Sequence, residues 1–170
     1  DSSFKGTLRW DEKNLYVYCE VTDDVFHQPF TNADVWQGDC IQIGIQSPPE
    51  LGRNEFSLSD ITFTEIAISK TKNGIEAYKY SAQNGFSTAL GLTDKITADI
   101  TEKNGKTIYK IVLPWTEIVG REKAQKGEEY RFNIIYNDND GSSRRGFMEL
   151  SEGIGSVKDA SRFTTVKLSD

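Results

Sequence analysis

Short segments in which apolar and polar residues alternate dominate this sequence of 170 residues. Alternation with a period of two is typical of β-strands that bury one face, because successive side chains point to opposite faces of a sheet. Gly, Asn, Asp and Pro separate the segments, as they do at turns between strands. The predicted strands are 4–10, 14–22, 40–46, 62–69, 75–80, 96–101, 106–113, 130–136 and 163–168.

Several of these strands are close enough in sequence to form hairpins, and no helical segments alternate with them. About ten strands in this arrangement predict an all-β fold, an antiparallel β-sandwich of jelly-roll or immunoglobulin-like form. Residues 114–119 are the one short helical turn that we expect, with Pro114 at its permitted first position. No repeat or linker divides the chain, so residues 1–170 are predicted to form one domain.

Composition narrows the range of partners. The formal net charge is -6, which disfavours nucleic acid because phosphate backbones are bound through clustered Lys and Arg. No run of about 20 apolar residues is present, so membrane insertion is not expected. A monomer is expected. Since the sequence begins at Asp1 without a leader segment, it is interpreted as a mature protein or as one domain of a larger chain.

The two cysteines fall on different strands of the predicted fold. Cys19 lies in the same alternating row as the apolar Val17 and Val21, whereas Cys40 alternates with Ile41 and Ile43. If both apolar rows face the core, the two sulfur atoms face apart, and a disulfide needs Cβ atoms that converge. Free thiols are therefore favoured over a bridge.

A tryptophan among polar residues gives the clearest indication of a binding site. Trp36 precedes the strand 40–46, and Asp34 and Asp39 flank it. Sugars stack their apolar faces on an indole while polar groups bind their hydroxyls, so the segment suits a carbohydrate. The alternative is a Trp that packs under a loop. Paired carboxylates can also serve glycosidases, but this spacing does not distinguish catalysis from capping or metal binding.

An oxygen-rich run, Asn137-Asp138-Asn139-Asp140-Gly141, follows a predicted strand. Calcium binds several such oxygens at a turn, and Asp23 and Asp24 end another strand. The run is not an EF-hand loop, because Tyr136 and Phe147 stand where that loop needs its first and last ligands. A polar hairpin turn is the alternative.

Beyond the acidic run, few side chains suit catalysis or haem. The guanidinium of Arg144 or Arg145 can pair with Asp138 or Asp140, or donate hydrogen bonds to ligand hydroxyls. His27 and Met148 are the sole histidine and methionine, and they are the one Met/His pair that could hold a haem iron. Loops carry binding residues on all-β scaffolds, and the longest irregular segment is 47–60.

An ordered set of short motifs resembles the carbohydrate-binding modules of family 9 and covers nearly the whole chain. The motifs are Trp10-Asp11-Glu12-Lys13-Asn14-Leu15-Tyr16-Val17, Val21-Thr22-Asp23-Asp24, Trp36-Gln37-Gly38-Asp39-Cys40-Ile41-Gln42-Ile43, Leu113-Pro114-Trp115, Asn137-Asp138-Asn139-Asp140-Gly141 with Arg144 and Gly146, and Gly153-Ile154 with Lys158-Asp159 and Phe163.

The resemblance implies a β-sandwich attached to secreted bacterial polysaccharide-degrading or surface-anchored proteins, with structural calcium. In the sugar-binding members it implies a ligand held between two tryptophans, of which Trp36 matches one and Val157 stands at the position of the other. Gln42 stands where those members carry Glu. The family's extra N-terminal strand segment is not found before Phe4.

Together these observations predict a noncatalytic module, secreted or at the bacterial cell surface, that attaches a polysaccharide-active or surface protein to plant-type polysaccharide. Its expected partners are a polysaccharide or oligosaccharide and neighbouring catalytic or anchoring domains. Two alternatives stay open: a structural or interaction β-sandwich without sugar affinity, which Val157 favours, and a haem-binding relative of the same superfamily. The candidate carbohydrate-binding residues are Trp36, Gln42, Asp39, Arg144 and Asn137, and the candidate calcium ligands are Asp138, Asp140, Asp23 and Asp24.

Overall fold

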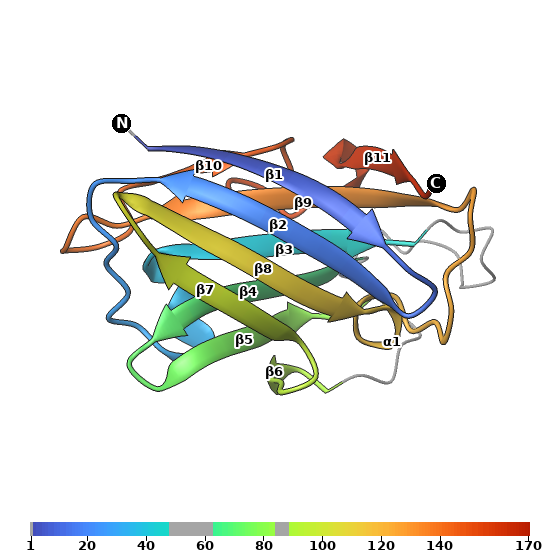
Figure 1. The fold of residues 1–170 in the computed structure, drawn as a ribbon, viewed down its shortest axis with the longest axis horizontal. Helices are drawn as coiled ribbons and strands as arrows, with labels where there is room; N and C mark the ends of the chain where they lie inside the picture. The colour runs from blue at the N-terminus through green and yellow to red at the C-terminus, as the bar shows by residue number, and fades with distance from the viewer. Residues whose placement is uncertain (1, 48–62, 84–88) are drawn as a thin grey trace.

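The computed structural model describes residues 2–47, 63–83 and 89–170, and these form two antiparallel β-sheets packed face to face (Figure 1). In chain order the strands are β1 (Ser3–Trp10), β2 (Asn14–Thr22), β3 (Cys40–Gln46), β4 (Thr64–Thr71), β5 (Gly74–Ser81), β6 (Gly91–Leu92), β7 (Thr97–Glu102), β8 (Lys106–Pro114), β9 (Glu129–Asp138), β10 (Gly146–Glu149) and β11 (Thr164–Lys167). The short helices are η1 (Asn32–Gln37), α1 (Trp115–Ile118) and η3 (Ala160–Arg162).

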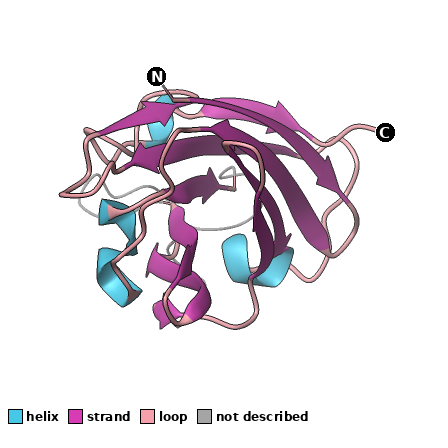
Figure 2. Cartoon of the chain, turned by 60° about the vertical axis from the view of Figure 1, so that its left-hand side comes forward, coloured by secondary structure: helices cyan, strands magenta, loops and turns pink. Residues whose placement is uncertain are grey.

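The smaller sheet has the order β1-β2-β8-β7. The larger sheet has the order β10-β9-β3-β4-β5-β6, and β11 pairs with β9 beside β10. Figure 2 shows the short helices outside the layers of strands. No helix among the described residues is long and apolar enough to cross a bilayer.

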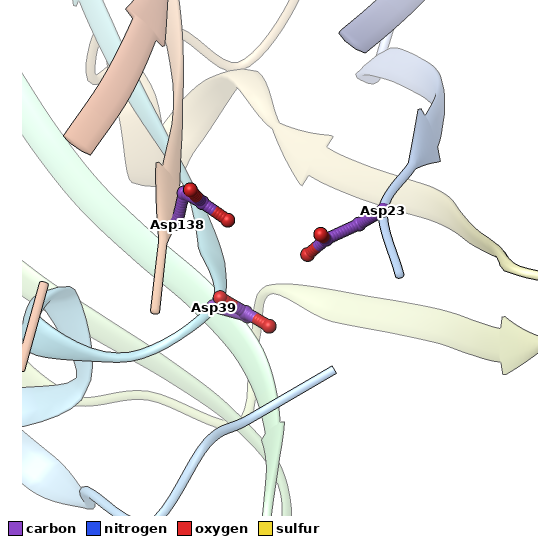
Figure 3. Close-up of side chains that lie close together, drawn as sticks. All are labelled: Asp23, Asp39 and Asp138. Atoms are coloured by element: carbon purple, nitrogen blue, oxygen red, sulfur yellow. The ribbon is translucent and has the colours of Figure 1, made fainter. Parts of the chain in front are cut away.

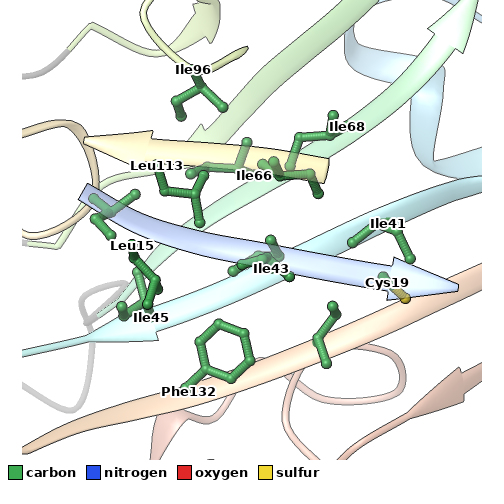
Figure 4. Close-up of a cluster of buried hydrophobic side chains, with 14 of the residues drawn as sticks. Leu15, Cys19, Ile41, Ile43, Ile45, Ile66, Ile68, Ile96, Leu113 and Phe132 are labelled. Carbon is green, nitrogen blue, oxygen red and sulfur yellow. The ribbon is translucent and has the colours of Figure 1, made fainter. Parts of the chain in front are cut away.

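The main core fills the space between the two sheets (Figure 4). Leu15, Val17 and Cys19 of β2 point into it from one sheet, and Ile43 and Phe132 point into it from the other. Each of these side chains is buried, as the alternating pattern predicts for the inner face of a strand. Burial of this apolar surface is the main force that holds the sheets together.

The larger sheet is covered on its outer face as well, which alternation alone does not predict. Every residue of β3 is buried. Two small apolar clusters lie against the outer face: Phe63, Ile135, Ile154, Ala160 and Phe163 form one, and Val35, Cys40 and Ala67 form the other, with Tyr78 and Tyr80 packed against it. The loops that supply these clusters therefore form a partial third layer over the larger sheet.

A buried ion pair fixes α1 beside the larger sheet. Lys79 of β5 is fully buried, and its Nζ lies 2.8 Å from Oε2 of Glu117 in α1. Lys95 reaches the other carboxylate oxygen of Glu117 from the surface, at 3.2 Å. Trp115 stacks on Tyr130 with ring centroids 5.1 Å apart, so α1 closes one end of the core.

The predicted all-β sandwich is confirmed, and so are its three hairpins. The strand 40–46 is reproduced residue for residue, and α1 lies within the expected helical turn 114–119. Differences are the added strands β6 and β10 and the 3-10 helices η1 and η3. Most of the irregular segment 47–60, with Thr62, lies outside the described residues.

Candidate functional site

A cleft of about 440 Å³ lies over the outer face of the larger sheet, between the two small apolar clusters. Its floor is formed by side chains of β3, β4 and β5 that point away from the main core. Its walls come from η1 and from the loops around residues 144 and 155. The lining residues are Trp36, Gln42, Phe63, Glu65, Tyr80, Ser81, Arg144, Ile154, Gly155 and Lys158.

Trp36 stands at the mouth of the cleft because η1 is anchored to the sheet beneath it. The neighbouring Val35 is fully buried, while 36% of Trp36 is exposed. Tyr80 Oη donates a hydrogen bond to the Ala33 carbonyl at 3.0 Å, and Gln28 Nε2 donates to the Val35 carbonyl at 2.8 Å. The indole is therefore held at the surface by a helix that cannot easily shift.

A bulge places Tyr80 next to the cleft. The register between β4 and β5 pairs Glu65 with Ser81 and Ile66 with Lys79, so Tyr80 has no partner on β4. Bulges bend a strand and redirect a side chain, and they are frequent beside binding sites. Here the bulge brings Tyr80 under η1, where burial raises the pKa of its phenol.

A chain of four hydrogen-bonded side chains forms the polar part of the cleft and supports it from beneath. Asn137 Nδ2 donates to Gln42 Oε1 at 2.6 Å, and Gln42 Nε2 donates to Glu65 Oε1 at 2.8 Å. Lys158 Nζ also lies 2.6 Å from Glu65 Oε1. Glu65 is almost completely buried, so its charge is compensated by a lysine that is half exposed at the cleft surface. Paired and hydrogen-bonded in this way, the carboxylate is tolerated in an apolar setting.

Arg144 forms part of the wall between two aromatic rings. Its guanidinium carbon lies 5.5 Å from the Trp36 ring centroid and 4.4 Å from the Phe147 ring centroid. The Nη2 atom is buried and has no hydrogen-bond partner among the described residues. Partial burial lowers the pKa of this guanidinium. A cation between aromatic faces is attracted by their π electrons, which partly replaces the missing hydrogen bonds.

Glu149 and Asn133 hold the loop around Gly155, which forms another part of the wall. Glu149 Oε1 accepts hydrogen bonds from the backbone N–H of Ile154 at 2.6 Å and of Gly155 at 3.2 Å. Asn133 Nδ2 donates to the Ser151 carbonyl at 2.7 Å. A Cβ atom on Gly155 would lie 2.3 Å from the Phe147 ring, so the loop approaches the ring as closely as glycine allows.

A second polar site, the carboxylate cluster, lies at the ends of β2 and β9 and before β3. Figure 3 shows the side chains of Asp23, Asp39 and Asp138 converging on one space, and one carboxylate oxygen of each lies within 4.8 Å of the others. Asp23 also groups with Asp24 and Asp140 within the same limit. Calcium prefers several oxygen ligands of this kind.

The hydrogen bonds of the carboxylate cluster leave oxygens free to hold an ion. Asp39 accepts the backbone N–H of His27 on Oδ2 and of Asn139 on Oδ1, both at 2.7 Å. Asp138 Oδ1 is buried without a partner among the described residues. Burial, opposed by those two N–H bonds and reinforced by the neighbouring carboxylates, raises the pKa of Asp39 to about 7. Burial and the nearby Asp23 and Asp140 raise the pKa of Asp138 as well. A bound cation would remove this repulsion, so the residues present fit calcium.

Comparison with known proteins identifies the family of this sandwich. The sequence profile described as "Carbohydrate family 9 binding domain-like" matches residues 1–170. The chain belongs to this family. The profile match makes it a carbohydrate-binding module of the family 9 type. No curated protein sequence matches it.

Two solved structures share its fold. A family 9 module from Caldicellulosiruptor kristjanssonii in complex with glucose has a TM-score of 0.72 and 17% identity, over 99% of this chain and 77% of that chain. A family 9 module from the same organism in complex with cellotriose has a TM-score of 0.69 and 18% identity, over 99% of this chain and 75% of that chain. Both neighbours were solved with a glucose-type sugar bound.

The structure separates the predicted carbohydrate residues into two groups. Trp36, Gln42 and Arg144 line the cleft of this family 9 module. Asp39 and Asn137 do not line it. Asp39 is fully buried in the carboxylate cluster, and Asn137 is fully buried beneath Gln42, which it orients by a hydrogen bond.

The predicted metal ligands are brought together. Asp23, Asp24, Asp138 and Asp140 all fall in the carboxylate cluster, and Asp39 joins them. Arg145, and not Arg144, forms the ion pair with Asp140. Cys19 and Cys40 are both buried and free, as the alternation of their strands predicts.

The positions of Val157, Met148 and His27 bear on the two alternative functions, a sandwich without sugar affinity and a haem-binding domain. Val157 is 41% exposed and does not line the cleft, whereas its neighbour Lys158 does. Met148 packs against the main core, and His27 bonds to Asp39 through its backbone. Neither contact supports an axial pair for haem.

Sequence reasoning missed Glu65, Lys158 and Tyr80. Glu65 had a detectable signal, because it is a charged residue directly before the apolar run Ile66-Ala67-Ile68 and alternates with the inward-pointing Ile66. No local signal marks Lys158, because its partner Glu65 is far away in the sequence. No local signal marks Tyr80, since its position depends on the bulge opposite β4.

Proposed function

We propose that this family 9 domain is a noncatalytic module that attaches a polysaccharide-active or cell-surface protein to plant-type polysaccharide through the cleft. One observation carries the proposal: an exposed indole stands over a floor of fixed polar groups in a cleft of about 440 Å³. Pockets of this size with a few convergent polar groups are typical of small-ligand sites. The secreted or bacterial-surface setting and the monomeric state are part of the proposal.

The cleft offers a sugar two kinds of contact. The apolar face of a pyranose ring can stack on Trp36, as apolar faces pack on aromatic rings. The ring hydroxyls can accept hydrogen bonds from Lys158 and Arg144 and donate to the carboxylate of Glu65, and all three side chains line the cleft. Because Gln42 and Asn137 hold Glu65 in place, its carboxylate is oriented before the ligand arrives. Preorganisation of this kind lowers the cost of binding.

Affinity is expected to be modest, because a single tryptophan serves the cleft and Val157 stands where the family resemblance implies the second. One stacking contact is worth about 1 to 3 kcal/mol, by analogy with bases stacked on aromatic side chains. Loss of that amount moves a dissociation constant from micromolar toward millimolar.

Isothermal titration calorimetry with glucose, cellotriose and xylan and mannan fragments tests the proposal. Trp36→Ala should abolish measurable heat, while the matched control Val157→Ala should keep the affinity, because Val157 does not line the cleft. If no sugar gives heat, or Trp36→Ala binds as the native protein does, the domain is a structural or interaction sandwich instead.

We also propose that the carboxylate cluster holds a structural calcium ion through Asp23, Asp39 and Asp138, with Asp24 and Asp140 at its edge. Asp138 Oδ1, which is buried and has no hydrogen-bond partner in the described part of the chain, supports this ligand set. A bound ion would neutralise the converging carboxylates and tie the ends of β2 and β9 to the start of β3. Calcium should raise the melting temperature, since a ligand that binds only the folded state stabilises it. Asp138→Asn should reduce the rise in melting temperature that calcium causes. A melting temperature that chelator leaves unchanged would overturn the proposed calcium site.

A further inference from the structure

The outer face of the smaller sheet carries a second hollow, away from both the cleft and the carboxylate cluster. It has a volume of about 370 Å³ and spans β1, β2 and β8. These strands belong to the layer nearer the viewer in Figure 1. Its polar and aromatic lining residues, the tyrosine face, are Thr7, Arg9, Tyr16, Tyr18 and Lys110.

Alternation along β2 explains why two tyrosines point outward. Leu15, Val17 and Cys19 enter the main core, so Tyr16 and Tyr18 between them face solvent. Tyr18 is 39% exposed. Residues two apart on a strand share a face and lie about 7 Å apart, so the two rings form a short aromatic platform.

Cationic side chains flank this platform on both neighbouring strands. Arg9 of β1 is opposite Tyr16, and Lys110 of β8 is opposite Tyr18. Directly opposed side chains on adjacent strands lie about 5 Å apart. The tyrosine face therefore places two aromatic rings, a guanidinium and an ammonium within the span of a short sugar chain.

Tyr16 is held rigidly, whereas the cations are available. Tyr16 Oη donates to Asp11 Oδ2 at 2.7 Å, and Asp11 Oδ1 accepts the backbone N–H of Lys13 at 2.7 Å. This hydrogen bond to Tyr16 is also the main cause that lowers the pKa of Asp11, so the carboxylate stays charged and holds the ring. A ring fixed before binding loses little conformational freedom when a ligand stacks on it.

The charge of the tyrosine face selects the class of ligand. Arg9 is exposed and forms no ion pair with the described residues. Lys110 pairs with Asp99 at 3.4 Å, but both side chains are about 60% exposed (60% and 61%), and such pairs contribute little. Among the residues that the structure describes, no carboxylate lines the hollow. The tyrosine face is thus locally cationic on a chain whose net charge is -6.

We propose that the tyrosine face is a second glycan site, which binds carboxylate-bearing sugar chains by stacking uronate rings on Tyr16 and Tyr18 and pairing their carboxylates with Arg9 and Lys110. The inference stands apart from the cleft, since no residue is shared between the two sites. A neutral chain would stack on the tyrosines but leave both cations unused.

Two-dimensional amide NMR titration with a tetramer of galacturonate tests the site, with the fully methyl-esterified tetramer as the neutral control. The acid should shift amide signals of β1, β2 and β8, and the ester should bind at least about fivefold more weakly, because it lacks the charge. Raising the salt concentration should weaken binding of the acid, since the charges are exposed.

Variants separate stacking, charge and the cleft. Tyr18→Ala should weaken binding of the acid about tenfold, and Tyr18→Phe, which keeps the ring, should not. Arg9→Gln should reduce the preference for the acid over the ester, because Lys110 alone then pairs with a carboxylate, and the exposed position of Arg9 makes the fold insensitive to the change. Trp36→Ala should leave binding at the tyrosine face unchanged, although it removes neutral sugar from the cleft.

Three results would overturn the proposal. The first is the absence of shifts on β1, β2 and β8 at millimolar uronate. The second is equal binding of the acid and the ester. The third is tighter binding of a single-stranded oligothymidylate than of the uronate tetramer at this face, which would assign the aromatic and basic residues to nucleic acid.

Discussion

A side chain at Gly44 of β3 should destabilise the domain, because the apolar cluster of Phe63, Ile135, Ile154, Ala160 and Phe163 packs directly against this residue. A Cβ atom at this position would lie 2.7 Å from Phe163 Cζ, 2.8 Å from Phe163 Cε2 and 3.0 Å from Ile154 Cδ1. Phe163 in turn packs edge-on against Phe63, with ring centroids 4.9 Å apart. Gly44→Ala therefore pushes on the whole apolar cluster that supports one side of the cleft.

The magnitude follows from two opposing effects. Overpacking a filled site costs typically about 1 to 3 kcal/mol. Replacing Gly by Ala returns about 0.4 to 1 kcal/mol, because the unfolded chain loses conformational freedom. We expect Gly44→Ala to lower the free energy of unfolding by about 1 to 2 kcal/mol, and so the melting temperature by about 2 to 8 °C for a domain of this size.

Urea unfolding followed by tryptophan fluorescence measures the change, and Gly146→Ala is the matched control. Gly146 also lies on a strand of the larger sheet, but a Cβ there meets no atom within 4 Å. The control should be neutral or slightly stabilising. Because Phe163→Leu removes the clashing ring atoms, combining it with Gly44→Ala should cost less than the sum of the two single changes. A Gly44→Ala protein as stable as the Gly146→Ala protein would refute the close packing of this apolar cluster on Gly44.

Three further predictions concern buried groups. Glu117→Gln leaves the buried Lys79 without a charged partner and should cost about 3 to 5 kcal/mol in urea unfolding, whereas Lys79→Met combined with Glu117→Leu should cost far less. Burial raises the pKa values of Cys19 and Cys40 to about 12, so a thiol reagent should label neither until the protein unfolds, and rapid labelling of the native protein would contradict this. In chelator the folded Asp39 keeps a proton up to a pKa of about 7, above its ordinary value of 3.8. The contribution of Asp39 to the free energy of unfolding is therefore fully present below pH 4 and falls as the pH rises from 4 to 7, by at most about 1.4 kcal/mol per unit. Saturating calcium should remove this fall, and a flat profile between pH 4 and 7 in chelator would disprove it.

The strands were predictable where the signal is local. The strand 40–46 alternates along its length and stops before two prolines, and both features can be read from the sequence. The strand β10 was not predictable, because the sequence Gly-Phe-Met-Glu does not alternate. It forms since β9 offers backbone partners, from Asp138 opposite Gly146 to Ile135 opposite Glu149.

The site was predictable only in part, because some of its residues carry a local signal and others are brought in by contacts between distant segments. Trp36 could be found because a large aromatic residue among polar neighbours is a local signal, although a tryptophan packed under a loop gives the same pattern. The ion pair between Lys158 and Glu65 joins residues 93 positions apart, and no local pattern announces it. Asp39 was assigned to the sugar because it follows Trp36 by three residues. The turn between them directs its carboxylate toward Asp23 and Asp138 instead.

Hydrogen bonds connect the cleft with the carboxylate cluster. Asn139 donates its backbone N–H to Asp39 and its side-chain Nδ2 to the Gln37 carbonyl, at 2.7 Å in each case, so one residue ties the carboxylate cluster to the end of the helix that carries Trp36. An ion that orders the cluster would therefore also order the wall of the cleft. Coupling of two binding equilibria is reciprocal, so if calcium tightens sugar binding, sugar must tighten calcium binding by the same factor. Titrating cellotriose with and without calcium, and calcium with and without cellotriose, measures both factors, and Asn139→Ala should bring both close to one while Trp36 remains in place.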